Sequence, residues 1–365
     1  MRRIAYVGVD YHINTVSMAV LVEGEKDFRN NFLLKNDDKM VHKYLKKLSK
    51  DYELRVCYEA SSCGYVFQRK LRTWGYHCDV IAPSLIPKKP GDRRKNDFRD
   101  ARSLAQHYRE GSLTVVNPPS EEEESVRGLI RCRMALKEAA KKAKLQINTF
   151  LLAHDLHWKK SKWTRSHRQW LSKTNFSDSC LQTVFAELCG HLEYLETRIG
   201  HLDSRIEEIG RSEVYGPSVK KLRAFKGIGT LAAMLLIAEI TDFRRFASPR
   251  ALMAFLGLIP SENSTGEKRR GGPITKAGNP RCRTQLIESV QQYMKRPVIG
   301  AVMKGNLTEV DAHSANIAIN CMNRLYKRFW SLTNRGKTRQ VAITAIAREF
   351  VGFIWAMMQT RPTAA

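Results

Sequence analysis

The sequence predicts an α/β domain at the N-terminus, followed by an α-helical coiled-coil segment and a mainly α-helical C-terminal domain. Three observations support this order. Strand-forming runs alternate with helical spacing at the start of the 365-residue chain, a heptad pattern occupies its middle, and helical segments separated by glycine-rich basic loops follow. We place the boundaries at 1–118, 119–215 and 216–365.

The N-terminal region begins with two β-rich runs within residues 4–23, on either side of a polar turn at His12 to Asn14. This arrangement predicts a β-hairpin. Two helices and two further strands follow in alternation, with helical spacing at 37–51 and 65–75 and strand patterns at 53–61 and 77–83. Strands that alternate with helices predict an α/β sheet.

Two long helices are predicted in the middle region. The first spans about residues 121–150, and the second keeps the heptad alternation without a break at Leu181, Phe185, Leu188, Leu192, Leu195, Ile199, Leu202, Ile206 and Ile209. This seam suits either two helices that pack within one chain or a contact between chains. The linking stretch 157–170 is rich in Trp and Lys, which suits base stacking or an ordinary amphipathic surface.

The C-terminal region opens at 219–240 with a helix, a "KGIG" turn and a second helix. This form is typical of a helix-hairpin-helix element, in which Lys226, Gly227 and Gly229 would approach a phosphate. A tight helical connection explains the turn equally well. Residues 244–290 are expected to be a loop between helices, and helices are predicted around 311–331 and 340–359.

The net charge favours a polyanionic partner. Lys and Arg number 62 against 36 Asp and Glu, which gives +26, and such an excess points to nucleic acid. The N-terminus predicts a strand and no signal peptide, and the longest apolar run, 231–238, is too short to span a bilayer. Eight scattered cysteines without a C-x-x-C pair indicate reduced thiols. We therefore expect a soluble cytoplasmic protein that binds nucleic acid and no membrane.

Four acidic residues are candidate metal ligands. Asp10 and Glu59 each follow a strand pattern, whereas Asp97 and Asp100 stand at helical i, i+3 spacing. Each alone is typical of a turn or a solvated surface. Together they predict a site for Mg²⁺, or Mn²⁺, because hard cations prefer oxygen ligands and relieve the repulsion among carboxylates. The basic residues beside the helical pair, Lys88, Lys89, Arg93 and Arg94, are expected to hold a phosphate backbone.

A second candidate site lies in the loop "PSENSTGEKRRGGPITKAGNPRCR", which starts at residue 260. Ser264 and Thr265 precede a set of cations that could bind phosphate: Lys268, Arg269, Arg270, Lys276, Arg281 and Arg283. A hydroxyl beside such cations is suited to act as a nucleophile in phosphoryl transfer. The alternative is a loop that grips phosphate without covalent chemistry, and spacing alone favours this alternative.

Six motifs together closely resemble the DEDD-type transposases of bacterial insertion sequences. They are "YVGVD", "YEAS", "KNDFRDARSLA", "FKGIG", "FLGLIPSENSTGEKRRGGPITKAGN" and "RQVAITAIAREFVGFIWAM". The resemblance covers nearly the whole chain in the family's order. It implies an RNase H-like (RuvC-like) N-terminal domain, a coiled-coil insertion and a C-terminal transposase domain. These recombinases are described as guided by a structured bridge RNA, so DNA, a guide RNA and a homo-oligomer, dimer or tetramer, are the expected partners.

The resemblance also assigns roles to individual residues. The family's four acidic positions correspond to Asp10, Glu59, Asp97 and Asp100, which implies Mg²⁺ binding. The family's nucleophilic serine stands directly before a glycine, where this chain has "STG". Thr265 therefore occupies the aligned position, and Ser264 precedes it with the less hindered hydroxyl. Two other functions are possible from the sequence: a metal-dependent junction nuclease that uses water, and a non-catalytic nucleic-acid-binding protein.

Overall fold

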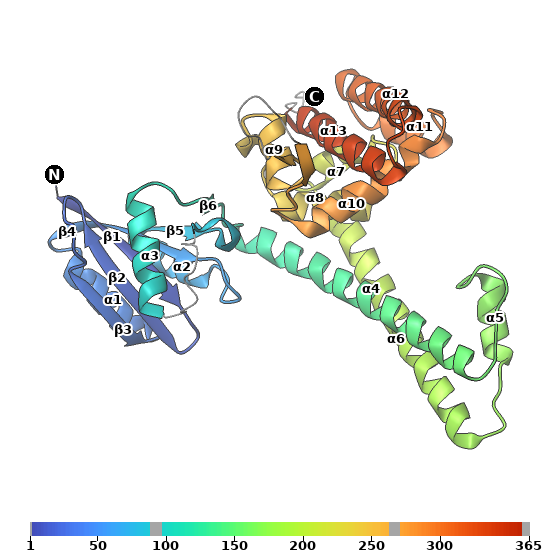
Figure 1. The fold of residues 1–365 in the computed structure, drawn as a ribbon, viewed down its shortest axis with the longest axis horizontal. Coiled ribbons are helices and arrows are strands. Elements are labelled where there is room, and N and C mark those ends of the chain that lie inside the picture. Colours follow the sequence, from blue (N-terminus) through green and yellow to red (C-terminus); the bar gives the residue numbers. More distant parts are fainter. Residues whose placement is uncertain (1, 88–96, 263–270, 360–365) are drawn as a thin grey trace. The chain divides into compact units, whose positions relative to one another are not determined.

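The computed structural model describes residues 2–87, 97–262 and 271–359 (Figure 1). The chain divides into two compact units, Met1–Pro119 and Ser120–Ala365, called here the N-terminal and C-terminal units. Together they show the predicted succession of a mixed α/β region and a mainly helical one.

The N-terminal unit contains a six-stranded sheet in the order β3-β2-β1-β4-β5-β6. The predicted hairpin is confirmed, since β1 pairs with β2 in antiparallel register, and β4 and β5 extend the sheet in parallel. Strands β3 and β6 at the two edges were not predicted. The strands are β1 (Arg3–Tyr11), β2 (Thr15–Val22), β3 (Asn30–Lys35), β4 (Tyr52–Glu59), β5 (His77–Ile81) and β6 (Val115–Val116).

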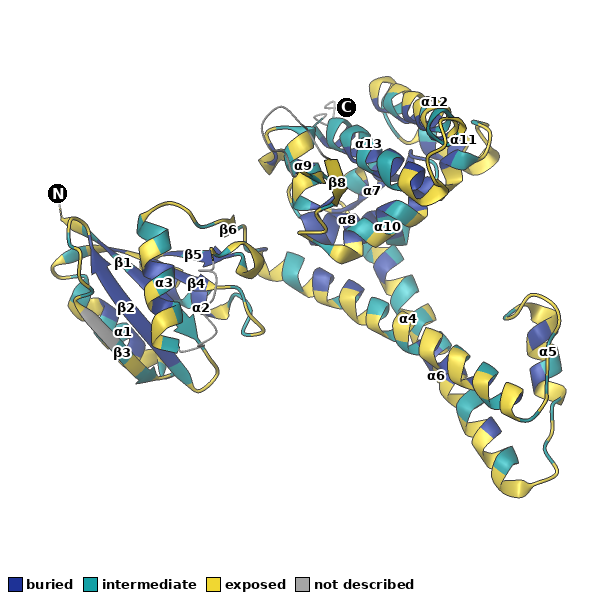
Figure 2. Cartoon of the chain, in the orientation of Figure 1, coloured by how far each residue is buried: buried dark blue, intermediate teal, exposed yellow. Residues whose placement is uncertain are grey.

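Helices cover both faces of this sheet. On one face, Val7 and Val9 of β1 pack against α1 (Asp38–Leu48) and α2 (Val66–Thr73), and β1 and β2 are largely buried (Figure 2). On the other face lies α3 (Asp97–Arg109), which packs on β1, β2 and β4. Because strand side chains alternate between faces, the residues of β1 that face α3 include Gly8 and, two positions later, Asp10.

The C-terminal unit begins with a long helical hairpin of α4 (Glu121–Ala153) and α6 (Ser179–Gly210). Ser120 and Glu123 form a capping box at the start of α4, where four consecutive glutamates suit the helix dipole. Ion pairs of Arg133 with Asp203 and of Lys144 with Glu196 show that the helices run antiparallel. The predicted heptad seam therefore packs against α4 of the same chain, with Leu192 and Leu195 buried.

The Trp-rich stretch at the end of this hairpin contains α5 (Arg165–Lys173). His167 is fully buried, and the rings of Trp158, Trp163 and Trp170 surround it. These aromatic residues therefore pack on one another within the chain. Arg168 of α5 forms a bidentate pair with Glu196 of α6, which joins the short helix to the hairpin.

Release of α5 at acid pH is one expected result. The hydrogen bond from Arg168, aided by Lys144, lowers the pKa of Glu196 from 4.5 to about 2. A lowered carboxyl pKa contributes stability above the unfolded-state value, and that stability is lost as the pH falls from about 4.5 through about 2. Tryptophan fluorescence should report the opening over this window.

The Glu196→Gln protein should already show a loosened α5 at neutral pH and a weaker acid transition. The matched control is Glu138→Gln, since Glu138 lies on the same hairpin in an exposed pair with Lys141, 3.9 Å apart. This control should titrate like the unmodified protein. An unchanged acid transition in Glu196→Gln would show that this ion pair does not hold α5.

The rest of the C-terminal unit packs around a second apolar core. Its helices are α7 (Gly216–Arg223), α8 (Thr230–Ile240), α9 (Pro249–Phe255), α10 (Pro280–Val290), α11 (Ala301–Thr308), α12 (Ala312–Asn334) and α13 (Arg339–Gln359). The expectation of a loop over 244–290 was wrong, because this stretch contains α9, α10 and a hairpin of β7 (Pro260–Glu262) and β8 (Gly271–Ile274). Its Gly and Pro content concealed the two strands, since both residues are rare in strands.

By length and composition, α13 is the one helix of the described segments that is apolar enough to cross a membrane. Its surroundings give it a different role here. It packs against α9, α10 and α12, and its residues Ile346, Phe350 and Ile354 are buried in the core of this unit. The polar pair Arg348 and Glu349 lies midway along it, so we describe α13 as a core helix.

Candidate active site

Two of the predicted carboxylates lie at the C-terminal ends of neighbouring parallel strands. Asp10 is the penultimate residue of β1, and Glu59 ends β4. In the register of the two strands Gly8 pairs with Cys57 and Val9 with Tyr58, so Asp10 and Glu59 follow at the same level. Cys57 contacts Leu104 of α3. By alternation, Glu59 and Asp10 therefore lie on the face that α3 covers.

The first turn of α3 supplies the other two carboxylates. Asp97 begins the helix, and both it and Asp100 are half-buried, whereas Phe98 and Arg99 between them are exposed. The i, i+3 spacing thus places the acidic pair on the side of the helix that faces the sheet. The N-terminal end of a helix stabilises negative charge, which favours carboxylates at this position.

Gly8 explains how α3 comes so close to β1. A Cβ atom on Gly8 would lie 2.1 Å from the carbonyl oxygen of Ala101 and 2.4 Å from the amide nitrogen of Ala105. Only glycine permits this approach between strand and helix backbones. The contact lies one turn beyond Asp97 and two residues before Asp10, so it sets the separation of these two side chains.

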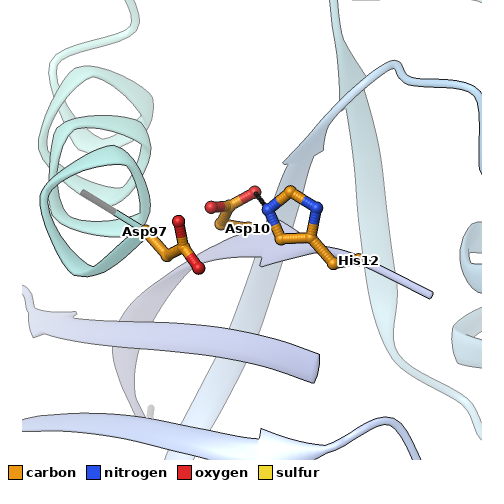
Figure 3. Close-up of side chains that lie close together, drawn as sticks. All are labelled: Asp10, His12 and Asp97. Carbon is orange, nitrogen blue, oxygen red and sulfur yellow. Dashed lines mark ion pairs between the residues drawn. The ribbon is translucent and has the colours of Figure 1, made fainter. Parts of the chain in front are cut away.

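Asp10, Asp97 and His12 form a compact cluster (Figure 3). Their potential ligand atoms all lie within 4.8 Å of one another, and His12 Nε2 is 3.1 Å from Asp10 Oδ1. His12 follows β1 directly, at the turn toward β2. The structure therefore brings together two of the four predicted carboxylates and a histidine that the sequence analysis had assigned only to a turn.

The electrostatics of the cluster favour a cation. Burial raises the pKa of the Asp10 carboxyl; His12 partly offsets this shift, and the charges of Asp97 and Asp100 raise the pKa further. Asp10 Oδ2 is buried and has no hydrogen-bond partner within the described residues. A buried acceptor without a partner is costly, and a bound cation would remove both this cost and the repulsion. The donor set of carboxylate oxygens therefore fits a divalent metal.

The predicted phosphate-binding residues fall into two groups. Lys88, Lys89, Arg93, Arg94, Lys268, Arg269 and Arg270 lie outside the described residues, as do both candidate nucleophiles, Ser264 and Thr265. The remaining ones lie in the C-terminal unit. Lys276 and Arg281 are exposed, whereas Arg283 donates from Nη1 to the carbonyl oxygen of Leu256 at 3.0 Å.

The "KGIG" turn connects α7 and α8, and its residues have distinct surroundings. Lys226 donates from Nζ to the carbonyl oxygen of Arg296 at 3.2 Å. Gly227 has φ +88°, and a Cβ atom there would lie 2.5 Å from the carbonyl oxygen of Ser289. Gly229 is the exposed N-cap residue of α8, and a Cβ atom there would meet no atom within 4 Å.

Both ends of the segment that carries Ser264 and Thr265 are anchored by backbone contacts. The amide of Thr275 donates to Ile259, and that of Lys276 donates to Gly257. Gly257 and Gly278 both have positive φ and lie close together. A Cβ atom on Gly257 would meet the backbone of Ala277 at 2.5 Å, and one on Gly278 would meet the carbonyl oxygen of Phe255 at 2.1 Å.

A buried polar network fixes Asn279, which follows the C-terminal end of the segment that carries Ser264 and Thr265. The Glu239 side chain is 1% exposed and accepts two hydrogen bonds from Arg131 and one from Asn279, at 2.7–2.8 Å. Burial opposes ionisation of Glu239, but Arg131 outweighs it and lowers the carboxyl pKa. Asn279 in turn caps α10, accepting from the amides of Arg281 and Cys282. The sequence analysis missed Glu239, because it follows an apolar run and its partners are distant in sequence.

Two family models match the chain. One, named DEDD_Tnp_IS110 and described as a transposase, matches residues 7–154, and a second, described as the transposase IS116/IS110/IS902 family, matches residues 219–302. Together they cover the acidic cluster and both ends, Gly257 and Gly278, of the segment that carries Ser264 and Thr265, called here the hydroxyl loop.

Curated relatives agree with these matches. A Sinorhizobium fredii protein named as a transposase is 37% identical over 97% of this chain and 88% of its own length. The transposase for insertion sequence element IS1533 of Leptospira borgpetersenii is 30% identical over 92% of this chain and 99% of its own. The transposase for IS1328 of Yersinia enterocolitica is 25% identical over 77% and 84%, respectively. The chain therefore belongs to the DEDD-type transposases of the IS110 family of insertion sequences.

Proposed function

We propose that the chain cleaves and rejoins DNA strands at an insertion-sequence junction through a covalent link between a loop hydroxyl and a DNA phosphate. The observation that carries this proposal is the approach of Asp97 on α3 to Asp10 on β1, with Glu59 in register beside it. Carboxylates gathered in this way fit the family's divalent-metal site.

In this proposal Asp10, Glu59, Asp97 and Asp100 would hold Mg²⁺ or Mn²⁺, and the bound metal would polarise the phosphate and stabilise its developing charge. The hydroxyl oxygen of Ser264 or Thr265 bonds to phosphorus as the bond to the leaving deoxyribose oxygen breaks. The hydroxyl proton passes overall to that leaving oxygen. Lys276 and Arg281 are exposed on either side of Gly278 and Asn279, and they would hold the DNA backbone.

We further propose that the chain consists of three functional regions. The strand order β3-β2-β1-β4-β5 supports an RNase H-like (RuvC-like) assignment for residues 1–118. Residues 119–215 would form the coiled-coil segment, and residues 216–365 the transposase domain, with a helix-hairpin-helix at α7 and α8. The chain would bind a structured guide RNA, form an oligomer of two or four copies and act in the cytoplasm. The charge of +26 and the family resemblance support these proposals.

A covalent-adduct assay tests this proposal. Labelled DNA carrying the element junction and its target is incubated with Mg²⁺ and the protein, together with any RNA that copurifies, and then denatured. A protein–DNA adduct is expected, and it should disappear in only one of the variants Ser264→Ala and Thr265→Ala. That result would identify the nucleophile.

Other outcomes would favour the two alternative functions. Cleavage without an adduct, unaffected by the loss of both hydroxyls, would indicate a metal-dependent nuclease that uses water. Tight binding without cleavage, unchanged by Asp10→Ala, would indicate a non-catalytic binding protein. The closeness of Asp10 and Asp97 argues against this last function, since a protein that only binds DNA gains nothing from two adjacent half-buried carboxylates.

A further inference from the structure

We propose that His12 is a further ligand of the metal site and that its imidazole shifts the site's preference from Mg²⁺ toward Mn²⁺. The inference rests on the proposed function, because it takes the cluster around Asp10 as the metal site. His12 belongs to none of the four acidic positions that define the DEDD set.

The spacing of the three side chains suits one octahedral cation. With metal–ligand distances of about 2.1 Å, neighbouring ligand atoms lie about 3 Å apart and opposite ones about 4.2 Å apart. His12 Nε2 and Asp10 Oδ1 are 3.1 Å apart, the separation of neighbouring ligands. The atom that Asp97 offers lies within 4.8 Å of both, so a small side-chain adjustment brings all three to one ion.

The hydrogen bonding of Asp10 also leaves room for a cation. His12 contacts only Oδ1, while Oδ2 is buried without a partner within the described residues. The contact with His12 therefore compensates for the burial of only one carboxylate oxygen, and the burial of the other remains costly. A metal ion bound by this carboxylate would compensate for its desolvation, and coordination of His12 Nε2 would replace the hydrogen bond to Oδ1.

Ligand chemistry then predicts the metal preference. Sites made of oxygen alone suit Mg²⁺, which binds nitrogen ligands poorly. Imidazole is a good ligand for first-row transition metals, and Mn²⁺ accepts both carboxylate and imidazole. Removing His12 should therefore weaken Mn²⁺ binding more than Mg²⁺ binding.

The test uses Mn²⁺ alone as the probe on the full-length protein. Pulsed electron paramagnetic resonance of bound Mn²⁺ is expected to show coupling to ¹⁴N from a directly bound imidazole, and this coupling should vanish in His12→Ala. Titration calorimetry should show Mn²⁺ affinity falling about tenfold in that variant, the scale typical of losing a metal-site interaction. Mg²⁺ affinity should change much less.

His77→Ala is the matched control. His77 lies in the same unit and forms the same kind of i, i+2 pair, with Nε2 3.2 Å from Asp79 Oδ2 and a similarly exposed side chain. This variant should retain both the ¹⁴N coupling and the Mn²⁺ affinity. Retention of the coupling in His12→Ala would overturn the inference.

The Asp10→Asn protein separates failure of this inference from failure of the metal site. Mn²⁺ that binds through Asp10 but shows no ¹⁴N coupling would overturn the role of His12 and leave the proposed function intact. Absence of Mn²⁺ binding, or binding unaffected by Asp10→Asn, would overturn both.

Discussion

Replacing Asp10 or Asp97 by asparagine is expected to slow DNA cleavage severely while leaving DNA binding and the fold in place. Asparagine keeps the size of the side chain but removes the charge that would hold a metal. Loss of metal-assisted charge stabilisation worth about 4 kcal/mol corresponds to a rate decrease of about 10³-fold. A strand-cleavage assay in Mg²⁺ would measure this decrease, and fluorescence anisotropy would measure DNA binding.

Thermal stability distinguishes this effect from misfolding. Burial raises the pKa of Asp10 more than His12 lowers it, and the charges of Asp97 and Asp100 raise it further, so the ionised carboxylate is destabilising in the metal-free protein. The melting temperature of Asp10→Asn should therefore not fall. Asp38→Asn is the control, because Asp38 is an exposed carboxylate of the same unit, paired with Lys70, and its loss should leave cleavage unchanged. Cleavage by Asp10→Asn within tenfold of the unmodified rate would contradict the prediction.

Substitution of Gly8 by alanine should have the largest effect on stability. The added methyl group would overlap the backbone of α3 at Ala101 and Ala105, and backbone atoms cannot rotate away as a side chain does. We expect a loss of about 3 kcal/mol, at the upper end for overpacking, and a melting temperature for the N-terminal unit lower by about 10 °C or more. Scanning calorimetry would measure the shift.

The same substitution should also weaken metal binding, because α3 carries Asp97 and can accommodate the methyl group only by moving away from β1. Gly128→Ala serves as the control. Gly128 lies within α4, where an added Cβ meets no atom within 4 Å, so alanine should be neutral or slightly stabilising. Equal melting temperatures for Gly8→Ala and the unmodified protein would show that α3 does not rest on Gly8 in solution.

The parts of the fold with strong periodicity could be predicted from the sequence. The hairpin of β1 and β2 and the seam of α6 each repeat a local pattern many times, which fixes the type of element. Edge strands lack this signal: β3 has the sequence "NNFLLK", in which apolar and polar residues do not alternate, and β6 has only two residues. They join the sheet because a neighbouring strand offers unpaired backbone groups.

The candidate site could be predicted only in part, because its geometry depends on contacts between distant segments. Residue types and spacing singled out Asp10 and Asp97, but their approach depends on Gly8, whose sequence context is that of an ordinary strand. His12 was assigned only to a turn, because its closeness to Asp97 arises only when α3 packs on the sheet. Glu239 was missed for the same reason, since its partner Arg131 is 108 positions away.

The two glycine contacts that anchor the hydroxyl loop have a consequence for how such proteins diversify. Gly257 and Gly278 join the two ends of this segment through backbone atoms, and Glu239 secures the downstream end from within the core. Among the described residues between them, Leu258 and Ile274 pack in the core of the unit, so we expect these two to be retained while exposed positions such as Lys276 can change. Loops exchanged between relatives at these two positions should therefore fold on the host protein, provided that the residues corresponding to Leu258 and Ile274 stay apolar.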